Sequence, residues 1–293
     1  MKKKRTTGDI VFDVLNYTFM IVLCLTTIYP FWNLFTQSIA SINVPTTELY
    51  LFPPETTFEN YRRVLENDDI IRGFAVTIFR TVVGTVLTLL VTLMAAYVLS
   101  KRYYPNRNLW TSLIVFTMFF NGGMIPTYLV VKGVGLLNSI WALILPGLAS
   151  AYNIVIARNY FMSLPESLEE SARIDGANDI RILFSIIMPL SKPIIATLAL
   201  WVAVDNWNAW FDCLLYITNS DIQVLQLVMR RIVLEGSAEY VNISTVEVSS
   251  NQAIMPESIK AATIMVTTIP ILIVYPFIQK YFVKGVMVGS LKG

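Results

Sequence analysis

Six runs of apolar residues recur along this 293-residue chain, each close to the roughly 20 residues that cross a lipid bilayer as a helix. The runs cover residues 14–36, 74–99, 109–131, 138–158, 193–217 and 261–283. Charged residues make up only 14% of the chain, against 55% hydrophobic residues, which leaves too little charge to coat six core helices of a water-soluble protein. The sequence therefore predicts an all-α membrane protein with six transmembrane helices.

The distribution of Lys and Arg predicts how these helices are oriented. Six crossings that start from an inside N-terminus place most of the 22 basic residues on the cytoplasmic side, as the positive-inside rule requires. The bias is strongest in two short flanks, Lys2–Arg5 and Lys101–Arg102. We therefore expect residues 1–13 and 284–293 to be cytoplasmic and residues 14–283 to form the membrane domain. The positive charge is a membrane signal and predicts no nucleic-acid partner.

Several local irregularities are expected along the chain. Pro30 should kink the first apolar run, because its ring and missing N–H interrupt regular helical bonding. The third run should break at Asn121-Gly122-Gly123 and Pro126. A turn at Pro53-Pro54 is expected to lead into a short helix around Asn60.

Several chemistries are excluded by residues that the chain lacks. It contains no histidine, which removes His-based metal sites, Ser-His triads and HExxH proteases. It also contains no GxxxxGK[ST] phosphate-binding loop. Cys24 and Cys213 both lie in apolar runs, where thiols commonly serve as small packing residues. We expect no catalytic residues, no metal site and no cofactor in this chain, so whatever energy it uses must come from a partner or a gradient.

A polar segment between the fourth and fifth apolar runs, residues 161–192, has the features of a two-part helical hairpin. A helix is expected to begin near Pro165, because proline suits a first turn and the acidic residues after it favour the positive end of the helix dipole. Gly176 permits a backbone conformation that other residues resist, so it is expected to join two short helices. Asp175 or Asn178 could cap the second helix.

The second helix of this hairpin is expected to present an apolar face made of Ile180, Phe184 and Ile187. Pro189 and Pro193 should end it before the fifth apolar run. The result would be an L-shaped projection at the membrane surface. The alternative is an ordinary amphipathic loop that lies on the lipid headgroups.

The hairpin sequence resembles the "EAA" coupling loop of bacterial ABC importer permeases. The match consists of Glu170-Ser171-Ala172, then Asp175-Gly176-Ala177, then Ile187-Met188-Pro189-Leu190. Ser171 replaces the usual alanine and is also small. The resemblance implies a type I ABC importer permease fold in which this loop docks into a cytoplasmic ATPase. It also implies that Glu170 makes charged contacts there and that Ala172 and Gly176 allow close approach.

Further motifs resemble the carbohydrate-importing members of this family, the class that includes the maltose system, and the resemblance covers essentially the whole chain. A narrower branch that imports complex oligosaccharides, some built from uronic acids such as alginate or aldouronate fragments, is indicated by the run Asn121–Tyr128. The motifs are Tyr29-Pro30-Phe31-Trp32, Phe58-Glu59-Asn60-Tyr61, Ala95-Ala96-Tyr97 and Trp207-Asn208-Ala209-Trp210.

Membership in such a family implies a set of partners. These would be a second permease subunit forming a heterodimer, two ATPase subunits that bind ATP and Mg²⁺, and an extracytoplasmic solute-binding protein. The assembly would lie in the bacterial inner membrane, surrounded by lipid, and move an oligosaccharide. The tail at residues 284–293 would reach toward the ATPases.

Polar and aromatic residues within the apolar runs are candidates for a substrate pathway, because sugars are bound by aromatic faces and hydrogen-bonding side chains. Trp207 and Trp210 could equally serve packing or interfacial anchoring. Arg80 is better explained by snorkelling or by a structural pair than by sugar binding. An acidic sugar would be repelled beside Asp205. The candidates are Asn121, Tyr128, Tyr152, Asn153, Asp205, Asn206, Trp207, Asn208 and Trp210.

Three other functions remain open from the sequence. A permease for another solute, such as an amino acid or a peptide, would share the coupling loop. A gradient-driven secondary transporter would normally show an internal repeat and ionisable pairs within its spans. An intramembrane enzyme would need a catalytic constellation, and none assembles without histidine.

Overall fold

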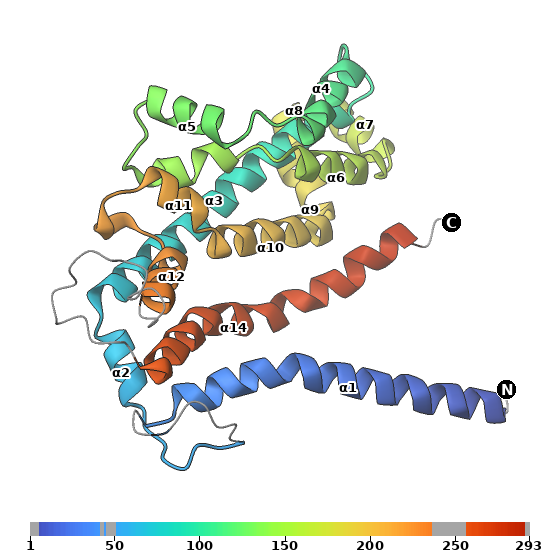
Figure 1. Ribbon diagram of the computed structural model, residues 1–293. Coiled ribbons are helices and arrows are strands. Elements are labelled where there is room, and N and C mark those ends of the chain that lie inside the picture. Colours follow the sequence, from blue (N-terminus) through green and yellow to red (C-terminus); the bar gives the residue numbers. More distant parts are fainter. Residues whose placement is uncertain (1–5, 42–43, 45–50, 236–255, 291–293) are drawn as a thin grey trace. The chain divides into compact units, whose positions relative to one another are not determined.

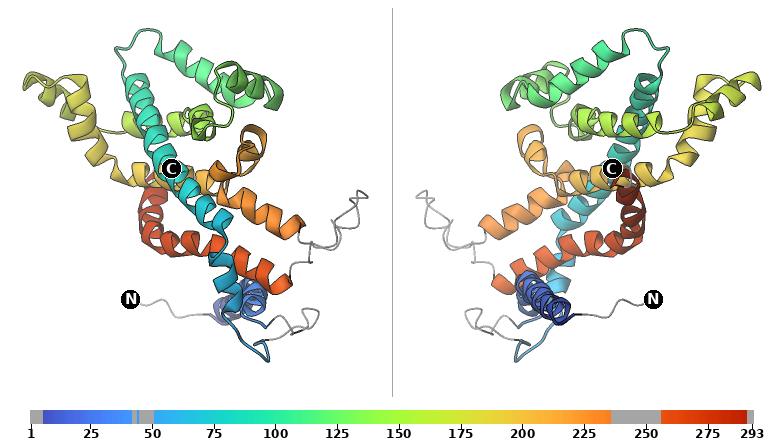
Figure 2. Two further views of the ribbon diagram at one scale, coloured as in Figure 1. Left: turned by 90° about the vertical axis from the view of Figure 1, so that its left-hand side faces the viewer. Right: turned by 90° about the vertical axis from the view of Figure 1, so that its right-hand side faces the viewer.

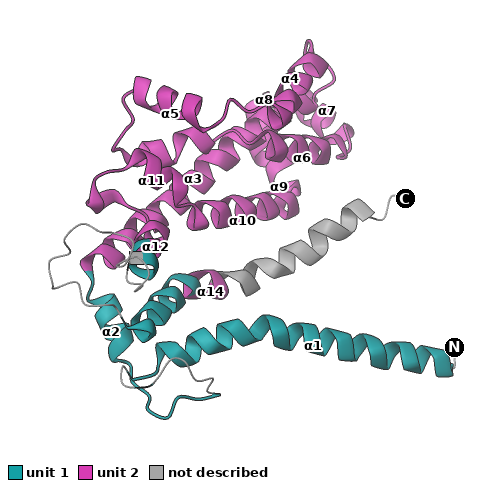
Figure 3. Ribbon diagram, viewed as in Figure 1, with its two compact units in different colours: residues 1–67, 231–268 teal, residues 68–230, 269–293 magenta. Residues whose placement is uncertain are grey.

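The computed structural model describes residues 6–41, 44, 51–235 and 256–290, with side chains described as far as residue 273 of the last helix. The described part is almost entirely helical, and its one isolated β-bridge joins Ala40 to Thr56. Two compact units can be distinguished: residues 1–67 with 231–268 (unit 1) and residues 68–230 with 269–293 (unit 2) (Figure 3).

The helices follow one another along the chain as labelled in Figure 1. The α-helices are α1 Thr7–Ser38, α2 Glu59–Leu65, α3 Asp68–Ser100, α4 Arg107–Phe119, α5 Met124–Gly133, α6 Ala151–Met162, α7 Ser167–Ile174, α8 Asp179–Ile182, α9 Met188–Leu190, α10 Lys192–Asn208, α11 Phe211–Tyr216, α12 Leu225–Glu235 and α14 Glu257–Ser290. The 3₁₀ turns are Ile140–Leu143, Leu145–Gly147 and Ser220–Ile222, and residues Leu183–Ile187 form a π-helical turn.

Unit 1 is held together where the short helix α2 meets the end of α1. Asn60 is fully buried and its side-chain amide donates hydrogen bonds to the backbone carbonyls of Ser38 (3.0 Å) and Ala40 (2.8 Å). The hydroxyls of Tyr61 and Ser38 are hydrogen-bonded at 2.7 Å. The two amide bonds provide donors for carbonyl groups at and just beyond the C-terminal end of α1, where a helix leaves carbonyls without partners. The Phe58–Tyr61 motif is therefore a structural clasp, and the short helix expected there is confirmed.

Unit 2 is built around α3, which packs against both α6 and α10. One buried core joins these three helices to the hairpin of residues 161–192, and includes Leu93, Ala157 and Leu198. A second core surrounds Cys213, which is fully buried as the sequence predicts; Cys24, in α1, is exposed. Because α3 contributes to the first core and contacts the 3₁₀ turns beside the second, it connects the two ends of unit 2.

The apolar runs predicted as six spans differ in their regularity. Two described helices, α1 and α3, are long and apolar enough to cross a membrane by themselves. Three further candidates are bent pairs: α4 with α5 at 113°, residues 140–147 with α6 at 48°, and residues 179–190 with α10 at 87°. Counting each bent pair as one span gives five within the described residues. The runs over 138–158 and 193–217 are each divided between shorter helical segments.

Each break has a local cause. The break after α4, expected from Asn121-Gly122-Gly123, is confirmed, because Gly123 has a φ of +88°, which side-chain-bearing residues rarely adopt. Ser150 begins α6 as its N-cap, with its hydroxyl accepting a hydrogen bond from the Asn153 amide. The fifth run is interrupted where α10 ends at Asn208, and a helix resumes only at Phe211, the start of α11. Helix α1 continues on both sides of Pro30.

Some predictions lie partly or wholly outside the described residues. These are the basic N-terminal flank, the middle of the polar segment before α14, and the last residues of the C-terminal tail. The sixth apolar run coincides with α14, which continues through Ser290 and so makes most of the predicted tail helical.

Candidate functional site: the helical hairpin of residues 161–192

The turn between α7 and α8 is a Schellman motif that the sequence encodes directly. Gly176 has a φ of +79°, its amide donates to the carbonyl of Arg173 (3.0 Å), and the next amide, of Ala177, donates to the carbonyl of Ala172 (2.9 Å). Paired bonds of this kind close the end of a helix when a glycine adopts the left-handed conformation. The expected junction of two short helices at Gly176 is confirmed, and Asp175 is the last residue before it.

The second arm of the hairpin begins at Asn178, whose side chain accepts a hydrogen bond from the Arg181 amide at 2.9 Å. Asn178, rather than Asp175, is therefore the N-cap. The predicted apolar face is only partly correct: Ile187 is buried, whereas Ile180 and Phe184 are 70% and 44% exposed. The π-helical turn over Leu183–Ile187 adds a residue to the helical repeat, which brings other side chains inward. The buried residues are Ile182, Leu183 and Ile187.

The hairpin is fastened to unit 2 through the first hydrophobic core. Ala172 is 8% exposed and packs in a cluster with Ala96 of α3, Phe161 of α6 and Ile182 of α8. Its methyl group faces inward and packs within the chain. Its small size fits this close packing. The inner side of the hairpin is therefore packed against the rest of unit 2. Figure 2 shows the segment from α7 to α9 extending away from α10 on one side of unit 2.

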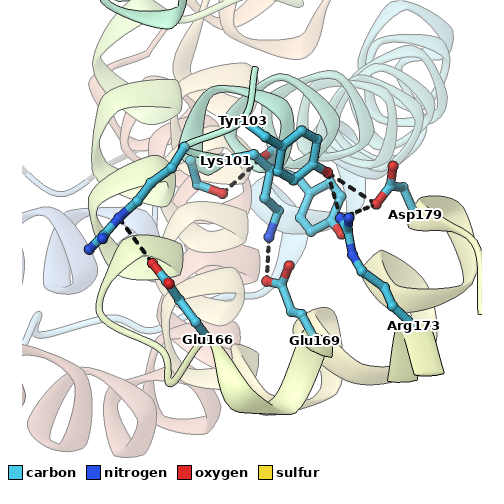
Figure 4. A network of polar contacts seen from close by, with 9 residues as sticks. Lys101, Tyr103, Glu166, Glu169, Arg173 and Asp179 are labelled. Atoms are coloured by element: carbon cyan, nitrogen blue, oxygen red, sulfur yellow. Dashed lines mark hydrogen bonds and ion pairs between the residues drawn. The ribbon is translucent and has the colours of Figure 1, made fainter. Parts of the chain in front are cut away.

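A set of polar contacts ties the hairpin to the end of α3 (Figure 4). Lys101, the first residue after α3, forms an ion pair with Glu169 of α7, and both side chains are largely buried. The Lys101 ammonium also lies 3.9 Å from the ring centroid of Tyr97, a cation–π contact. Burial lowers the pKa of Lys101, while the hydrogen bond and charge of Glu169 oppose that shift. A second pair joins Arg102 to Glu166 at 3.0 Å on the exposed side.

Three further side chains form a closed triangle across the hairpin turn (Figure 4). The Arg173 guanidinium donates to the Tyr103 hydroxyl and to the Asp179 carboxylate, both at 2.6 Å, and Tyr103 donates to Asp179 at 3.1 Å. The Arg173 guanidinium also stacks over the Tyr103 ring, 4.7 Å from its centroid. The triangle links both arms of the hairpin to the segment that follows α3. Loss of water around the Tyr103 hydroxyl raises its pKa, and Asp179 adds to this while Arg173 opposes it.

The outer surface of the hairpin carries groups suited to contact with another protein. Glu170 is exposed and, in the part of the chain that the structure describes, forms no ion pair. Ile174 and Ile180 flank the turn with 87% and 70% of their surfaces exposed. Ser171 is also exposed, and its hydroxyl donates to the Ser167 carbonyl at 2.9 Å. Exposed isoleucines beside such a carboxylate favour a partner with both an apolar and a basic contact.

Sequence reasoning missed the residues that hold the hairpin in place. Lys101 and Arg102 were interpreted only as a topology signal, and Tyr103 was not singled out. Their partners lie about 70 positions away, so no local pattern connects them. The one available signal was charge complementarity between this basic flank and the acidic start of the hairpin.

Four of the predicted pathway residues come together in a cavity of about 800 Å³ within unit 2, hereafter the cavity. Tyr152 and Asn153 reach it from the start of α6, and Asp205 and Asn206 from the end of α10. Its other walls come from α3, the 3₁₀ turns before α6, α11 and Ile271. A hollow of this size, with aromatic and polar groups converging on it, has the character of a small-molecule pocket.

The other predicted pathway residues do not line the cavity. Trp207 is buried with its ring 6.3 Å from that of Phe74, which matches the packing alternative. Trp210 holds Arg230 over its ring at 4.0 Å. Tyr128 stacks on Tyr216 at 6.2 Å. Asn208 is exposed at the end of α10, and Asn121 lines a shallower hollow of about 570 Å³ that Tyr152 also borders.

Arg80 forms a buried ion pair at the wall of the cavity, as the structural interpretation of this residue predicts. Its guanidinium is 5% exposed, pairs with Asp212 and donates to the Ala209 carbonyl at 3.2 Å. Asp212 also accepts a hydrogen bond from the Cys213 amide at 2.9 Å. The pair therefore ties the middle of α3 to the start of α11, across the break that ends α10.

Comparison with known proteins places these features in a family. Residues 105–288 match the family model described as binding-protein-dependent transport system inner membrane component. The polygalacturonan/rhamnogalacturonan transport system permease protein YtcP of Bacillus subtilis is 42% identical over 96% of this chain and 98% of its own length.

Two solved structures share the fold. One, from a bacterial ABC transporter involved in the import of the acidic polysaccharide alginate, has a TM-score of 0.87 and 33% identity, covering 96% of this chain and all of its own. The other, from a bacterial alginate ABC transporter in complex with a periplasmic protein bound to alginate pentasaccharide, has a TM-score of 0.58, 15% identity and 94% and 96% coverage. The chain therefore has the type I ABC permease fold and belongs to the family of binding-protein-dependent transport system inner membrane components.

Proposed function

We propose that this chain is one permease subunit of an ATP-driven importer for oligosaccharides, in which the hairpin of residues 161–192 couples the membrane domain to an ATPase. The observation that carries the proposal is the division of the hairpin into two sides. Its inner side is anchored to unit 2 by Ala172, Ile182 and the Lys101–Glu169 pair. Its outer side presents Glu170, Ile174 and Ile180 to solvent.

This arrangement supports a role in which movement of the hairpin is transmitted to α3. A partner that moves the outer side must also move α3, because a largely buried ion pair and a packed core connect the two. Packed cores deform little and shift between discrete arrangements, so a displacement at the hairpin would be carried along the 33 residues of α3. Helix α3 reaches the cavity through Arg80 and Thr88. The site residues for coupling remain those of the hairpin: Glu170, Ser171, Ala172, Asp175, Gly176, Ala177 and Pro189.

The proposed assembly has the composition that the family implies. A second permease subunit would complete the pathway as a heterodimer, two ATPase subunits would bind ATP and Mg²⁺, and an extracytoplasmic binding protein would deliver the cargo. The family description supports the binding protein, since it names binding-protein-dependent transport. We further propose six spans with both termini in the cytoplasm and the boundaries 1–13, 14–283 and 284–293. The five described candidates, together with α14, support this number.

Two observations support oligosaccharides as the cargo: what similar proteins transport, and which side chains line the cavity. The similar Bacillus subtilis permease serves a polygalacturonan/rhamnogalacturonan system, and the similar solved transporter imports alginate. Both names denote polysaccharides that contain uronic acids, so a uronic oligosaccharide is the finer proposal. The cavity offers the aromatic and hydrogen-bonding groups that sugar recognition requires.

Reconstitution of the whole assembly in lipid tests the proposal. ATP hydrolysis would be measured with and without binding protein, and with neutral or uronic oligosaccharides. We expect stimulation only when binding protein and a saccharide are both present. Glu170→Lys should abolish this stimulation, because it reverses the charge offered to the ATPase while leaving the core untouched.

A matched control separates loss of coupling from loss of folding. Glu66→Lys reverses an exposed carboxylate that pairs with Arg62 of α2, outside the hairpin, and should leave stimulation intact. Normal stimulation and uptake by the Glu170→Lys variant would contradict the coupling role. Absence of ATPase co-purification, together with indifference to every saccharide, would contradict the importer function.

A further inference from the structure

Two aromatic rings form a platform at the cavity. Tyr152 from α6 and Trp201 from α10 have ring centroids 6.0 Å apart and planes inclined by 33°. Both line the cavity, and Tyr152 is 53% exposed. An aromatic face that is open to a cavity leaves apolar surface available for contact. Trp201 was not among the residues that the sequence singled out.

Polar groups surround this platform on the same wall. Asp205 follows Trp201 by one helical turn on α10, a spacing that places both side chains on one face of the helix. Asn206 comes next on α10, and Asn153, which follows Tyr152 on α6, is largely buried and also lines the cavity. An apolar platform bordered by a carboxylate and two amides matches the two-sided chemistry of a sugar ring, which has apolar C–H faces and a polar hydroxyl edge.

The charge of the cavity decides which part of a saccharide it can hold. Both terminal nitrogens of Arg80 are engaged by Asp212, so these two charges compensate each other. Asp205 forms no ion pair in the part of the chain that the structure describes, and it is exposed to the cavity. A carboxylate accepts hydrogen bonds and donates none when ionised. The uncompensated charge therefore favours hydroxyl donors and repels a second carboxylate.

We propose that this cavity is a saccharide subsite that holds a sugar ring by its C–H face and its hydroxyl groups, and that Asp205 selects against a carboxylate at this position. Trp201 and Tyr152 stack on the ring, and Asp205 accepts from its hydroxyls. The proposal rests on the proposed oligosaccharide function and deepens it. It implies that the carboxylates of a uronic cargo point away from this wall.

Competitive uptake into proteoliposomes containing the complete transporter and its binding protein tests the subsite. The two probes are a neutral galactan tetrasaccharide and a galacturonan tetrasaccharide, each below saturation. Asp205→Asn should lower uptake of the neutral probe about tenfold, the loss typical of a hydrogen bond to a charged group. It should also raise the ratio of uronic to neutral uptake, since the repulsion is removed. Trp201→Leu should lower uptake of both probes, and Trp201→Phe should retain most of it.

Matched controls lie in unit 2 but outside the cavity lining. Trp141→Leu removes an exposed indole from the 3₁₀ turn before α6, and Asp221→Asn removes an exposed carboxylate that pairs with Arg72 at 3.3 Å. Tyr152→Ala and Tyr152→Phe provide a second test of the platform if Trp201→Leu fails to fold. An unchanged uptake ratio in Asp205→Asn, or equal uptake by Tyr152→Ala and Tyr152→Phe, would overturn the subsite while the wild type still transports. A wild type that moves neither probe would overturn the oligosaccharide function itself, and the subsite with it.

Discussion

Lys101 and Glu169 lie 68 positions apart in the sequence, yet their side chains form an ion pair with only 10% and 16% of their surfaces exposed. The pair joins the end of the longest helix of unit 2 to the first arm of the hairpin. A charge removed from water is tolerated only with a partner, so each of these residues constrains the position of the other. The attachment of the hairpin thus depends on two residues from different parts of the chain.

The first prediction concerns this pair. Lys101→Met should destabilise the protein by about 3 kcal/mol, because Glu169 is left charged and largely buried without a counterion. The double variant Lys101→Met with Glu169→Leu should recover most of the stability that Lys101→Met alone loses. A double-mutant cycle from thermal unfolding in nanodiscs measures the coupling.

The exposed Arg102–Glu166 pair provides the control for this cycle, with side chains 78% and 65% exposed. Its coupling energy should be about 1 kcal/mol or less, because solvent screens it. Equal coupling energies for the two pairs would show that burial does not distinguish them.

The second prediction is a pH dependence at Tyr103. Because loss of water raises the pKa of its hydroxyl, a larger fraction of Tyr103 should be protonated at pH 10 than of a tyrosine in water, which is half ionised at that pH. The folded state then holds a proton that the unfolded state releases, so stability should fall as the pH rises above 10. The absorbance of tyrosinate near 295 nm, compared between wild type and Tyr103→Phe, reports the titration.

Well below pH 10, where the tyrosine is protonated in both the folded and the unfolded state, the contribution of this proton to stability should not vary with pH. If the difference spectrum shows Tyr103 titrating at or below pH 10, the proposed effect of its surroundings is wrong.

The third prediction concerns Gly176 and its positive φ. A Cβ at this position would have no neighbouring atom within 4 Å, so the cost of Gly176→Ala is backbone strain alone, about 1–2 kcal/mol. Gly176→Asn should cost less, because asparagine tolerates the left-handed conformation. Thermal unfolding should rank the wild type as the most stable of the three proteins, followed by Gly176→Asn and then Gly176→Ala.

Gly133→Ala is the matched control, since it too has open space but lacks a positive φ. It should be neutral or slightly stabilising, by less than about 1 kcal/mol. A similar loss at both glycines would argue against the Schellman geometry as the cause.

The fourth prediction concerns the clasp in unit 1. Asn60→Asp replaces the amide donor of two buried hydrogen bonds with a carboxylate that faces the carbonyls of Ser38 and Ala40. We expect a loss of at least about 3 kcal/mol, since both carbonyls lose their donor and a charge is buried. Limited proteolysis of the segment between α1 and α2 should become faster.

Tyr61→Phe is the milder comparison, because it removes a single hydroxyl contact to Ser38. Its cost should be about 1 kcal/mol. Asn60→Asp with wild-type protease resistance would mean that the two amide bonds do not hold the clasp.

The local chemistry of the hairpin could be predicted from the sequence because it depends on nearest neighbours. Gly176 closes α7 and Asn178 begins α8 through bonds that span only a few residues. The break at Gly123 was foreseen for the same reason. By contrast, Ile180 and Phe184 were placed on the buried face because an ideal helical period was assumed, and the π-helical turn at Leu183–Ile187 changes that period.

Apolar run length, helix caps and glycine turns act over short distances along the chain, so the sequence was enough to predict a helical membrane protein with a capped two-part hairpin. The residues that seat this hairpin, and those that face the cavity, became apparent only in the folded chain. Lys101 meets Glu169, and Trp201 lies beside Tyr152, whereas Trp207 packs against Phe74. Such pairings depend on how α3, α6 and α10 cross, and crossings are set by close packing between segments that no sequence spacing records.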